Sequence, residues 1–299
     1  MISSETLVSM FKKWNHSESK RGLILISTPF GFSFLLLVMP LILILLLSFW
    51  TQNYLELERT FSFTNYIEAW SHPLYRSLMI RSLSISAIVT MGTVLLAFPM
   101  AYFISFHGGN HKALWLFLVT IPFWTSYLLR IFLWKVILGY NGVLNSSLEW
   151  LGVIEEPLIF ILYNANAVVI ALTHAWAPYA ILPIYVALEK IDRNLIDAAK
   201  DLGDGMLRRF LRVTLPLAMP GVVAAVLIVF IPTVGEYVTP RLVGGKDGLM
   251  IANMIQVQFL KANNAPLGAA LAVSSMLIVA TFSLMFVALN QKWFRKQVS

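Results

Sequence analysis

The chain has 299 residues, a mean hydropathy of +0.75 and only 12% charged residues. Soluble domains carry about 25% charged residues, so this composition excludes an ordinary soluble globular protein. The absence of cysteine excludes disulfides and thiolate metal sites, but it says nothing about the cellular compartment. A net charge of +7 raises the question of a nucleic-acid partner, and in so apolar a chain the location of the cations decides that question.

Long uncharged runs predict the fold class. A helix that crosses a bilayer needs about 20 largely apolar residues. Runs of this kind predict an all-α integral membrane protein with six crossings, at residues 22–50, 79–106, 113–137, 160–188, 213–235 and 265–290. The third uncharged run is the shortest, and it reaches Ile137 only if Arg130 and Lys135 extend toward the membrane surface.

The first apolar run is expected to be retained as a helix. It follows residues 1–21, which are mostly polar, and it is longer than the apolar core of about 7–15 residues that is usual in a signal peptide. No small-residue cleavage site follows it. The segment 1–21 is therefore predicted to be an N-terminal extension of the membrane domain 22–291.

The positive charges are concentrated in one set of connecting segments. The N-terminal segment, the second loop, the fourth loop and the tail 292–299 hold most of them, namely Lys12, Lys13, Lys20, Arg21, Lys112, Lys190, Arg193, Lys200, Arg208, Arg209, Arg212, Lys292, Arg295 and Lys296. The opposite loops hold Arg59, Arg76, Arg241, Lys246 and Lys261. Because cytoplasmic loops are enriched in Lys and Arg, we predict that both termini and the fourth loop are cytoplasmic. The positive charge is then mostly topological, and no nucleic-acid partner is expected.

The fourth loop, residues 190–212, has a helical pattern rather than the composition of a slack linker. Apolar side chains recur at steps of three and four at Leu195, Ala199, Leu202, Met206 and Phe210. This spacing places them on one helix face. Such a ridge needs something to bury it. The alternatives are packing on the protein's own crossings, insertion into the lipid interface, and a socket in a partner protein.

The same loop contains signals for a bend and for helix ends. Asn194 approximates a helix start. Gly203 and Gly205 lower the cost of a bend between two short helices. Thr214 and Pro216 suit the opening of the next helix. The sequence therefore predicts two short helices joined rigidly to the fifth crossing.

The order of residues within this loop resembles a known motif. The stretch DAAKDLGDGMLRRFLRVTLP resembles the EAA loop of ABC-importer permeases, with Asp197 where glutamate is usual. The resemblance implies the type I (MetI-like) permease fold, and it implies that the loop is a coupling helix seated in a cleft of an ATPase subunit. The coupling residues carried over by the motif and the ridge are Asp197, Ala198, Ala199, Gly203, Met206, Phe210, Leu215 and Pro216.

Three further stretches narrow the resemblance. IPFWTSYLLRIF (121–132), NGVLNSSLEWLGVIEEPL (141–158) and FIPTVGEYVTPRLVGGKDGLMIANMIQVQF (230–259) look like the permease subunits of spermidine/putrescine importers, nearest the putrescine type. The resemblance implies a bacterial inner-membrane complex with a second homologous permease, two ATPase subunits and a periplasmic polyamine-binding protein. Related permeases move other small solutes, such as ferric ion, thiosulfate or opines, so the substrate stays open.

The sequence contains no motif for catalysis or for energy conversion. It lacks GxxxxGK[ST], the nucleophile elbow GxSxG and any cluster with metal-ligand spacing. We therefore expect a non-catalytic subunit that binds no cofactor or metal and depends on ATP and magnesium used by partner ATPases. A secondary transporter should show an internal repeat or midplane charges, and a simple membrane anchor would not need the loop spacing.

A route for an extended polycation favours aromatic faces and a few carboxylates. Glu236, next to Tyr237, follows Pro232 and Gly235, which should break the fifth crossing toward its outer end. The alternative is an interfacial acid paired with Arg241. The predicted pathway residues are Glu236, Tyr237, Trp124, Tyr127, Trp176 and Tyr179. For the four in the third and fourth crossings, the alternatives are membrane-interface anchoring and helix packing.

The remaining charged residues to be placed are cations and acids near the predicted outer ends of the crossings. Arg81, Arg130 and Lys135 are expected to extend toward the membrane surface and away from a cationic substrate. The stretch SSLEWLGVIEEP is expected to form a small amphipathic helix followed by a turn. It is either an interfacial helix or part of a dock for the binding protein, together with the outer acids Glu56, Glu58, Glu68, Glu149, Glu155 and Glu156.

Overall fold

The computed structural model describes residues 18–54 and 56–298, and almost all of this part of the chain is helical. The long helices are α2 (Glu18–Ser48), α4 (Pro73–His107), α8 (Ala165–Glu189), α11 (Leu215–Val234) and α14 (Ala265–Val298). Shorter helices are α3 (Thr64–Ser71), α5 (Lys112–Thr120), α6 (Tyr127–Ile137), α7 (Val143–Trp150), α9 (Arg193–Asp201), α10 (Met206–Arg209), α12 (Val238–Val243) and α13 (Ile251–Leu260). The predicted all-α class is confirmed.

Short irregular elements link these helices. Three 3₁₀ turns are η1 (Gly109–His111), η2 (Ile121–Trp124) and η3 (Ile159–Ile161), and a π-helical turn, η4, covers Phe210–Thr214. An antiparallel hairpin of β1 (Thr51–Asn53) and β2 (Glu56–Glu58) follows α2 and pairs Thr51 with Glu58.

Helices α4, α8 and α11 pack together and form the main core. Their contact faces are rich in small buried residues, including Ala97, Ala101, Ala171, Ala218 and Ala225. Gly221 of α11 lies so close to α8 that an added Cβ would clash with the Pro183 carbonyl oxygen and the Ala187 side chain. Small residues let helix backbones approach closely, which drives helix packing where lipid replaces water.

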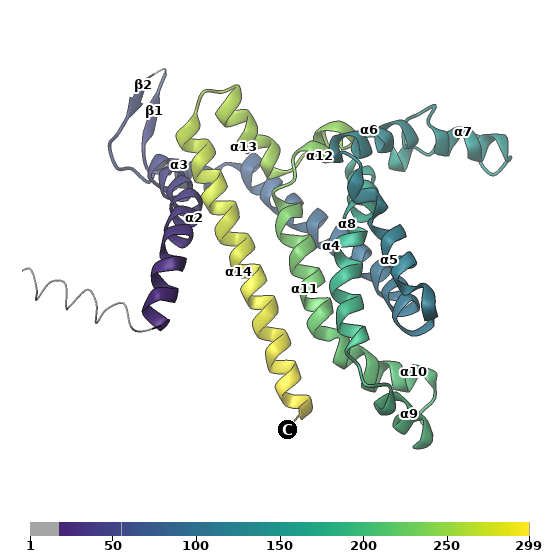
Figure 1. Cartoon of the computed structure of the whole chain (residues 1–299). Helices are drawn as coiled ribbons and strands as arrows, with labels where there is room; N and C mark the ends of the chain where they lie inside the picture. Colours follow the sequence, from purple (N-terminus) through teal and green to yellow (C-terminus); the bar gives the residue numbers. More distant parts are fainter. Residues whose placement is uncertain (1–17, 55, 299) are drawn as a thin grey trace, which may run out of the picture.

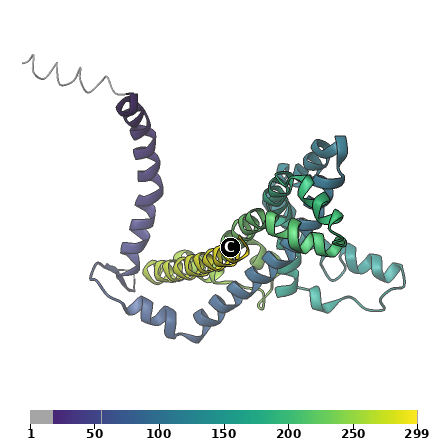
Figure 2. The same ribbon diagram turned by 90° about the horizontal axis from the view of Figure 1, so that it is seen from below.

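Five of the predicted crossings correspond to single helical rods that are long and apolar enough to span a membrane. They are α2, α4, α8, the continuous segment Met206–Val234 and α14. Figure 1 shows the start of α2, the end of α14 and the pair α9–α10 at one end of the molecule, which we call the elbow end. The β-hairpin, α7 and the α13–α14 connection lie at the opposite end, which we call the hairpin end. Figure 2 shows α2 projecting away from the α4–α8–α11 core.

The third predicted crossing is wrong as a straight helix. The segment from Gly109 to Trp124 and the segment from Tyr127 to Ile137 are bent against each other by 88°. Pro122 lies in the last turn before the bend, and Thr125 and Ser126 have extended backbone with ψ of 146° and 134°. The two halves therefore form a broken span, with α6 lying across the hairpin end of the core (Figure 1).

The end of the fifth rod and the two helices after it form a second irregular region. Pro232 stays inside α11, which ends at Val234 with Gly235 as its C-cap. Helices α12 and α13 come directly after α11 in the chain, and no sequence pattern predicted them. Helix α13 is fixed to α4, since the Ile251 backbone N–H donates to Ser82 Oγ at 2.7 Å and Gln258 Nε2 donates to the Tyr75 hydroxyl at 3.2 Å.

Candidate functional site

The elbow, residues 190–214, consists of two short helices joined at a glycine. Helix α9 begins after Asp192, whose Oδ1 accepts from the Asn194 backbone N–H at 3.0 Å, so the predicted start at Asn194 is two residues too late. The helix ends where Gly203 adopts a φ of +84°, a conformation that favours glycine. The Asp204 backbone N–H then donates to the Ala199 carbonyl at 3.0 Å, which closes the turn. The predicted bend therefore lies at Gly203.

The second arm of the elbow is continuous with the fifth rod. Helix α11 begins at Leu215 with Pro216 in its first turn, as the predicted opening at Thr214–Pro216 requires, and helical structure runs unbroken from Met206 through η4 into it. Proline lacks the N–H that the carbonyl four residues earlier would accept, and a π-helical turn accommodates such a mismatch. Here η4 ends one residue before Leu215, and Pro216 falls in the first turn of α11. The arm and the rod therefore form one lever.

The predicted apolar ridge divides into an inner and an outer part. Ala199 is buried, and the ring of Phe210 packs edge-on against Phe98 and Tyr102 of α4, at centroid distances of 5.5 and 6.4 Å. In contrast, Leu202 is 87% exposed and Met206 is 74% exposed. The inner part of the ridge therefore packs on the protein's own crossings, which is one of the predicted alternatives, and the bend at Gly203 turns the outer side chains away from the bundle. The tip is an apolar surface that the chain itself leaves uncovered.

The residues of the motif are arranged around this tip. Asp197 and Ala198 are exposed, whereas Leu215 and Pro216 are half-buried at the start of α11. Arg212 Nη1 lies 3.5 Å from Asp204 Oδ1, which adds an ion pair across the bend. The exposed side chains on α9 and α10 are thus available to another protein, while the buried ones hold the elbow in shape.

A second group of predicted residues meets at the broken span. Tyr127, Trp176 and Tyr179 line one cavity of about 170 Å³, whose other lining residues are Phe123, Thr125, Arg130 and Ala175. The rings of Phe123 and Tyr179 pack edge-on at 4.3 Å, and those of Trp176 and Tyr179 lie 5.3 Å apart. Trp124 does not join this group, because it is 80% exposed and packs against Phe117 instead.

Arg130 is buried in this cavity, contrary to the prediction that it extends to the membrane surface and away from the candidate pathway. Its guanidinium donates to the carbonyls of Pro122 at 2.6 Å and of Thr125 and Ala175 at 3.5 Å each. Carbonyls at a helix C-terminus lack intrahelical donors and attract a positive charge. Arg130 therefore satisfies the carbonyls at the break and ties them to α8.

The other two cations that were expected to extend toward the membrane surface are Arg81 on α4 and Lys135 on α6. Arg81 Nη1 donates to the Lys246 carbonyl at 3.2 Å, which connects α4 to the loop after α12. Lys135 is half-buried on α6.

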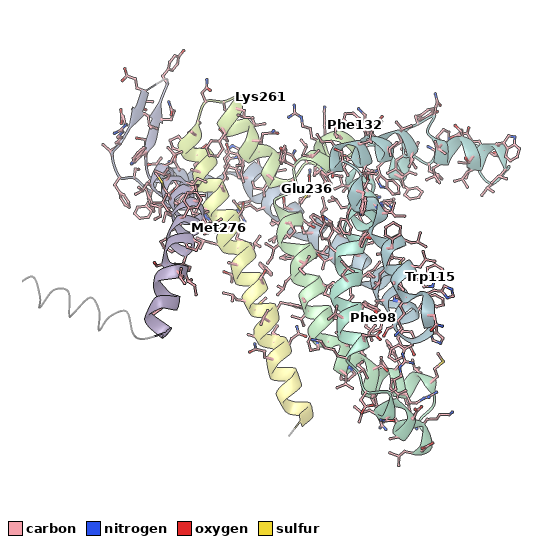
Figure 3. The ribbon with its side chains drawn as sticks, viewed as in Figure 1. Phe98, Trp115, Phe132, Glu236, Lys261 and Met276 are labelled. Carbon is pink, nitrogen blue, oxygen red and sulfur yellow. The ribbon has the colours of Figure 1, made fainter. Side chains whose placement is uncertain are left out.

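Glu236 lies at the upper end of α11, below the level of Lys261 (Figure 3). Its Oε1 accepts from the backbone N–H groups of Val238 at 2.8 Å and Thr239 at 3.2 Å, so the carboxylate caps α12. The alternative pairing with Arg241 is not what the structure has, because Arg241 donates to Gln256 at 3.2 Å.

The carboxylate of Glu236 is linked to the cavity through the third span. The Tyr127 hydroxyl lies 2.8 Å from Thr239 Oγ1 and also faces Glu236. Tyr237 is 43% exposed, and its carbonyl accepts from Asn253 Nδ2 at 2.7 Å. Five of the six predicted pathway residues therefore lie around the junction of α6, α8 and α12, and Trp124 lies outside it.

An exposed arm extends from this junction at the hairpin end. Helix α7 begins at Val143, three residues before the predicted amphipathic stretch, and ends at Trp150. Buried Asn145 donates to the Gly139 and Tyr140 carbonyls at 3.2 Å each and accepts from the Leu158 backbone N–H at 3.0 Å, which closes the loop. Trp150, Leu151 and Val153 are exposed.

Comparisons with known proteins agree on the class of this chain. The family model "Binding-protein-dependent transport system inner membrane component" matches residues 20–295. The chain is 35% identical over 269 residues to the spermidine/putrescine transport system permease protein PotB of Salmonella typhimurium, covering 90% of this chain and 93% of the relative. It is 36% identical over 276 residues to PotB of Haemophilus influenzae, covering 91% and 95%. A bacterial ABC transporter involved in the import of the acidic polysaccharide alginate matches in structure, with a TM-score of 0.71, 15% identity and coverage of 95% and 99%.

Proposed function

The chain belongs to the family of binding-protein-dependent transport system inner membrane components, with the type I ABC-importer permease fold, and from this premise we propose that it forms half of a translocation pathway for polyamines. The observation that carries the choice of substrate is the 35–36% identity, over about nine-tenths of the chain, to permeases named for spermidine and putrescine.

The proposed complex contains two ATPase subunits, a second homologous permease and a periplasmic binding protein. The exposed tip of the elbow supports an ATPase contact, because Leu202 and Met206 need cover that this chain does not supply. The second permease supplies the other half of the pathway. ATP and magnesium are used by the partner subunits, and this chain contributes no catalytic residue, cofactor site or metal site.

The proposed orientation places the elbow end in the cytoplasm. The start of α2, the end of α14 and the elbow lie at one end of the molecule, and the segments near these points carry most of the Lys and Arg. The β-hairpin and the α7 arm then face the periplasm, where the acids Glu149, Glu155 and Glu156 are available to a binding protein.

The proposed route follows the carboxylate and the aromatic faces at the junction of α6, α8 and α12. Glu236 supplies the negative charge for an ammonium group, and Tyr127, Trp176, Tyr179 and Tyr237 supply aromatic faces for cation–π and apolar contact. The coupling side of the proposal uses the motif residues Asp197 to Pro216. ATP-driven closure of the ATPase subunits displaces the elbow, and the continuous rod Met206–Val234 tilts with it and opens the cavity alternately to each side.

A second candidate substrate class is an anionic small solute such as thiosulfate. The observation that favours it is Arg130, the charged residue among those that line the cavity at the break. A cation there repels an ammonium group, whereas it attracts an anion.

Uptake by proteoliposomes that contain the full complex tests both candidates. With the cognate binding protein and ATP, we expect saturable uptake of radiolabelled putrescine or spermidine that excess thiosulfate does not inhibit. Saturable uptake of radiolabelled thiosulfate, together with an absence of polyamine uptake, would select the anionic solute instead.

A further inference from the structure

A cluster of polar side chains connects the base of the elbow to three crossings. Glu189 is the last residue of α8, and its Oε1 accepts from Lys112 Nζ at 2.6 Å, at the first residue of α5. Its Oε2 accepts from Ser105 Oγ at 3.1 Å, on α4. One carboxylate therefore binds together the elbow ends of α4, α5 and α8.

The same cluster holds the first residue of α9. Arg193 Nη2 donates to the Ser105 backbone carbonyl at 3.1 Å, and its guanidinium lies 5.7 Å from the ring centroid of Phe106. Ser105 is buried and uses its hydroxyl for Glu189 and its carbonyl for Arg193. The attachment of α9 to α4 thus passes through a residue that α8 also holds.

The short link between α8 and α9 is anchored to the core and to α9. Residues 190–192 separate the two helices, and within this stretch Ile191 is buried in the main core while Asp192 caps α9. An exposed Lys–Glu pair alone contributes only about 0–1 kcal/mol. Here the carboxylate also receives a hydroxyl from a buried serine, and charge-assisted bonds in such networks are the stronger ones.

We propose that Glu189 is a positioning residue that fixes the base of the elbow to the second, third and fourth crossings, so that a displacement of α9 moves these crossings together. The inference rests on the proposed function, because it requires that an ATPase subunit displaces the elbow. It adds a second attachment beside the continuous rod Met206–Val234. Without Glu189, the ends of α4, α5 and α8 are no longer held to one another at the base of the elbow, so a displacement of α9 moves these crossings less completely together.

The test is the ratio of solute taken up to ATP hydrolysed by the full complex in proteoliposomes. For Glu189→Gln, we expect ATP hydrolysis within about twofold of the wild type and a ratio that is lower by about tenfold, the effect of one charge-assisted hydrogen bond. Lys112→Gln and Ser105→Ala each remove one partner, so they should lower the ratio by a smaller factor. Asp247→Asn, at an exposed carboxylate in the loop after α12, is the matched control and should leave the ratio unchanged.

An unchanged ratio in Glu189→Gln would overturn the proposal, as would equal losses of uptake and ATP hydrolysis, which indicate a purely structural role. If Glu189→Gln does not assemble, Ser105→Ala decides by the same criteria, because it removes only a hydroxyl. Failure of the proposed function would give a different result, because the wild-type complex itself would then show no uptake, or no chemical cross-link between the elbow and an ATPase subunit.

Discussion

The elbow and the cavity at the broken span differ in how far this chain covers their side chains. The outer side chains of the elbow, Leu202 and Met206, are exposed, whereas Arg130 at the broken span is buried with three carbonyl acceptors. The outer side chains of the elbow are therefore left uncovered by this chain, whereas the terminal guanidinium nitrogens of Arg130 bind carbonyls of the same chain. The difference supports the proposed contact of the elbow with another protein, while Arg130 holds the two halves of the broken span together.

The largest effect should come from charging the exposed tip of the elbow. Leu202→Asp and Met206→Asp should each weaken ATPase binding by about 100-fold. Each removes an apolar contact that the proposed ATPase interface buries, worth about 1.5–3 kcal/mol, and adds a charge that must lose its water on binding. Binding of the detergent-solubilised permease pair to the ATPase subunit measures this. Leu151→Asp on the exposed arm is the control, and equal loss of binding there would contradict the comparison.

The next effect is on the stability of the break. Arg130→Ala should lower the free energy of unfolding by about 1.5–3 kcal/mol, because it removes the charge-assisted hydrogen bonds from the guanidinium to the carbonyls of Pro122, Thr125 and Ala175. Thermal unfolding in detergent checks this. Arg81→Ala removes a single hydrogen bond to the Lys246 carbonyl and should cost less. Equal melting temperatures of the Arg130 variant and the wild type would show that the guanidinium does not hold the break.

The two elbow glycines offer a matched pair. Gly203 has a φ of +84°, whereas Gly205 has a φ of −67°, and a Cβ added at either position would have open space within 4 Å. Gly203→Val should therefore strain the backbone by about 1–2 kcal/mol and weaken ATPase binding by about tenfold. Gly205→Val should change binding by less than about twofold. Similar losses in both variants would refute the role of the left-handed turn.

The smallest effect should come from Glu236→Gln. The carboxamide oxygen can still cap α12, so the local structure should persist while the negative charge is lost. We expect the KM for polyamine uptake to rise by about fivefold, which corresponds to about 1 kcal/mol of charge interaction. Asp247→Asn, at an exposed carboxylate in the loop after α12, is the control. Unchanged uptake kinetics in Glu236→Gln would remove this residue from the pathway.

The crossings and the elbow could be predicted because their signals are local. An uncharged run of sufficient length indicates a span, and the spacing from Asp197 to Pro216 indicates two short helices before the fifth rod. The sequence predicted the existence of these elements better than their exact ends and connections. It could not show that the rigid join to the fifth rod is made through a π-helical turn, η4, since that depends on how the backbone accommodates Pro216.

The break in the third span and the contacts of Arg130 and Glu189 could not be predicted, because the partners in these contacts are backbone carbonyls or residues far away in the sequence. No residue pattern marks the carbonyls of Pro122 and Ala175 as acceptors for Arg130. The contact of Glu189 with Lys112 joins residues 77 positions apart. Trp124 and Tyr127 are three residues apart and look like a pair, but the 88° bend between them sends them to different surroundings.

The most direct test of the central claim is a site-specific cross-link, which the cysteine-free chain makes simple. Met206→Cys introduces a single thiol at the tip of the elbow, and Val153→Cys introduces one on the exposed arm as a control. In the assembled complex, we expect a thiol cross-linker to join the Met206→Cys chain, and not the Val153→Cys chain, to an ATPase subunit. An assembled complex in which the Met206→Cys chain gives no cross-link to the ATPase subunit would contradict the account.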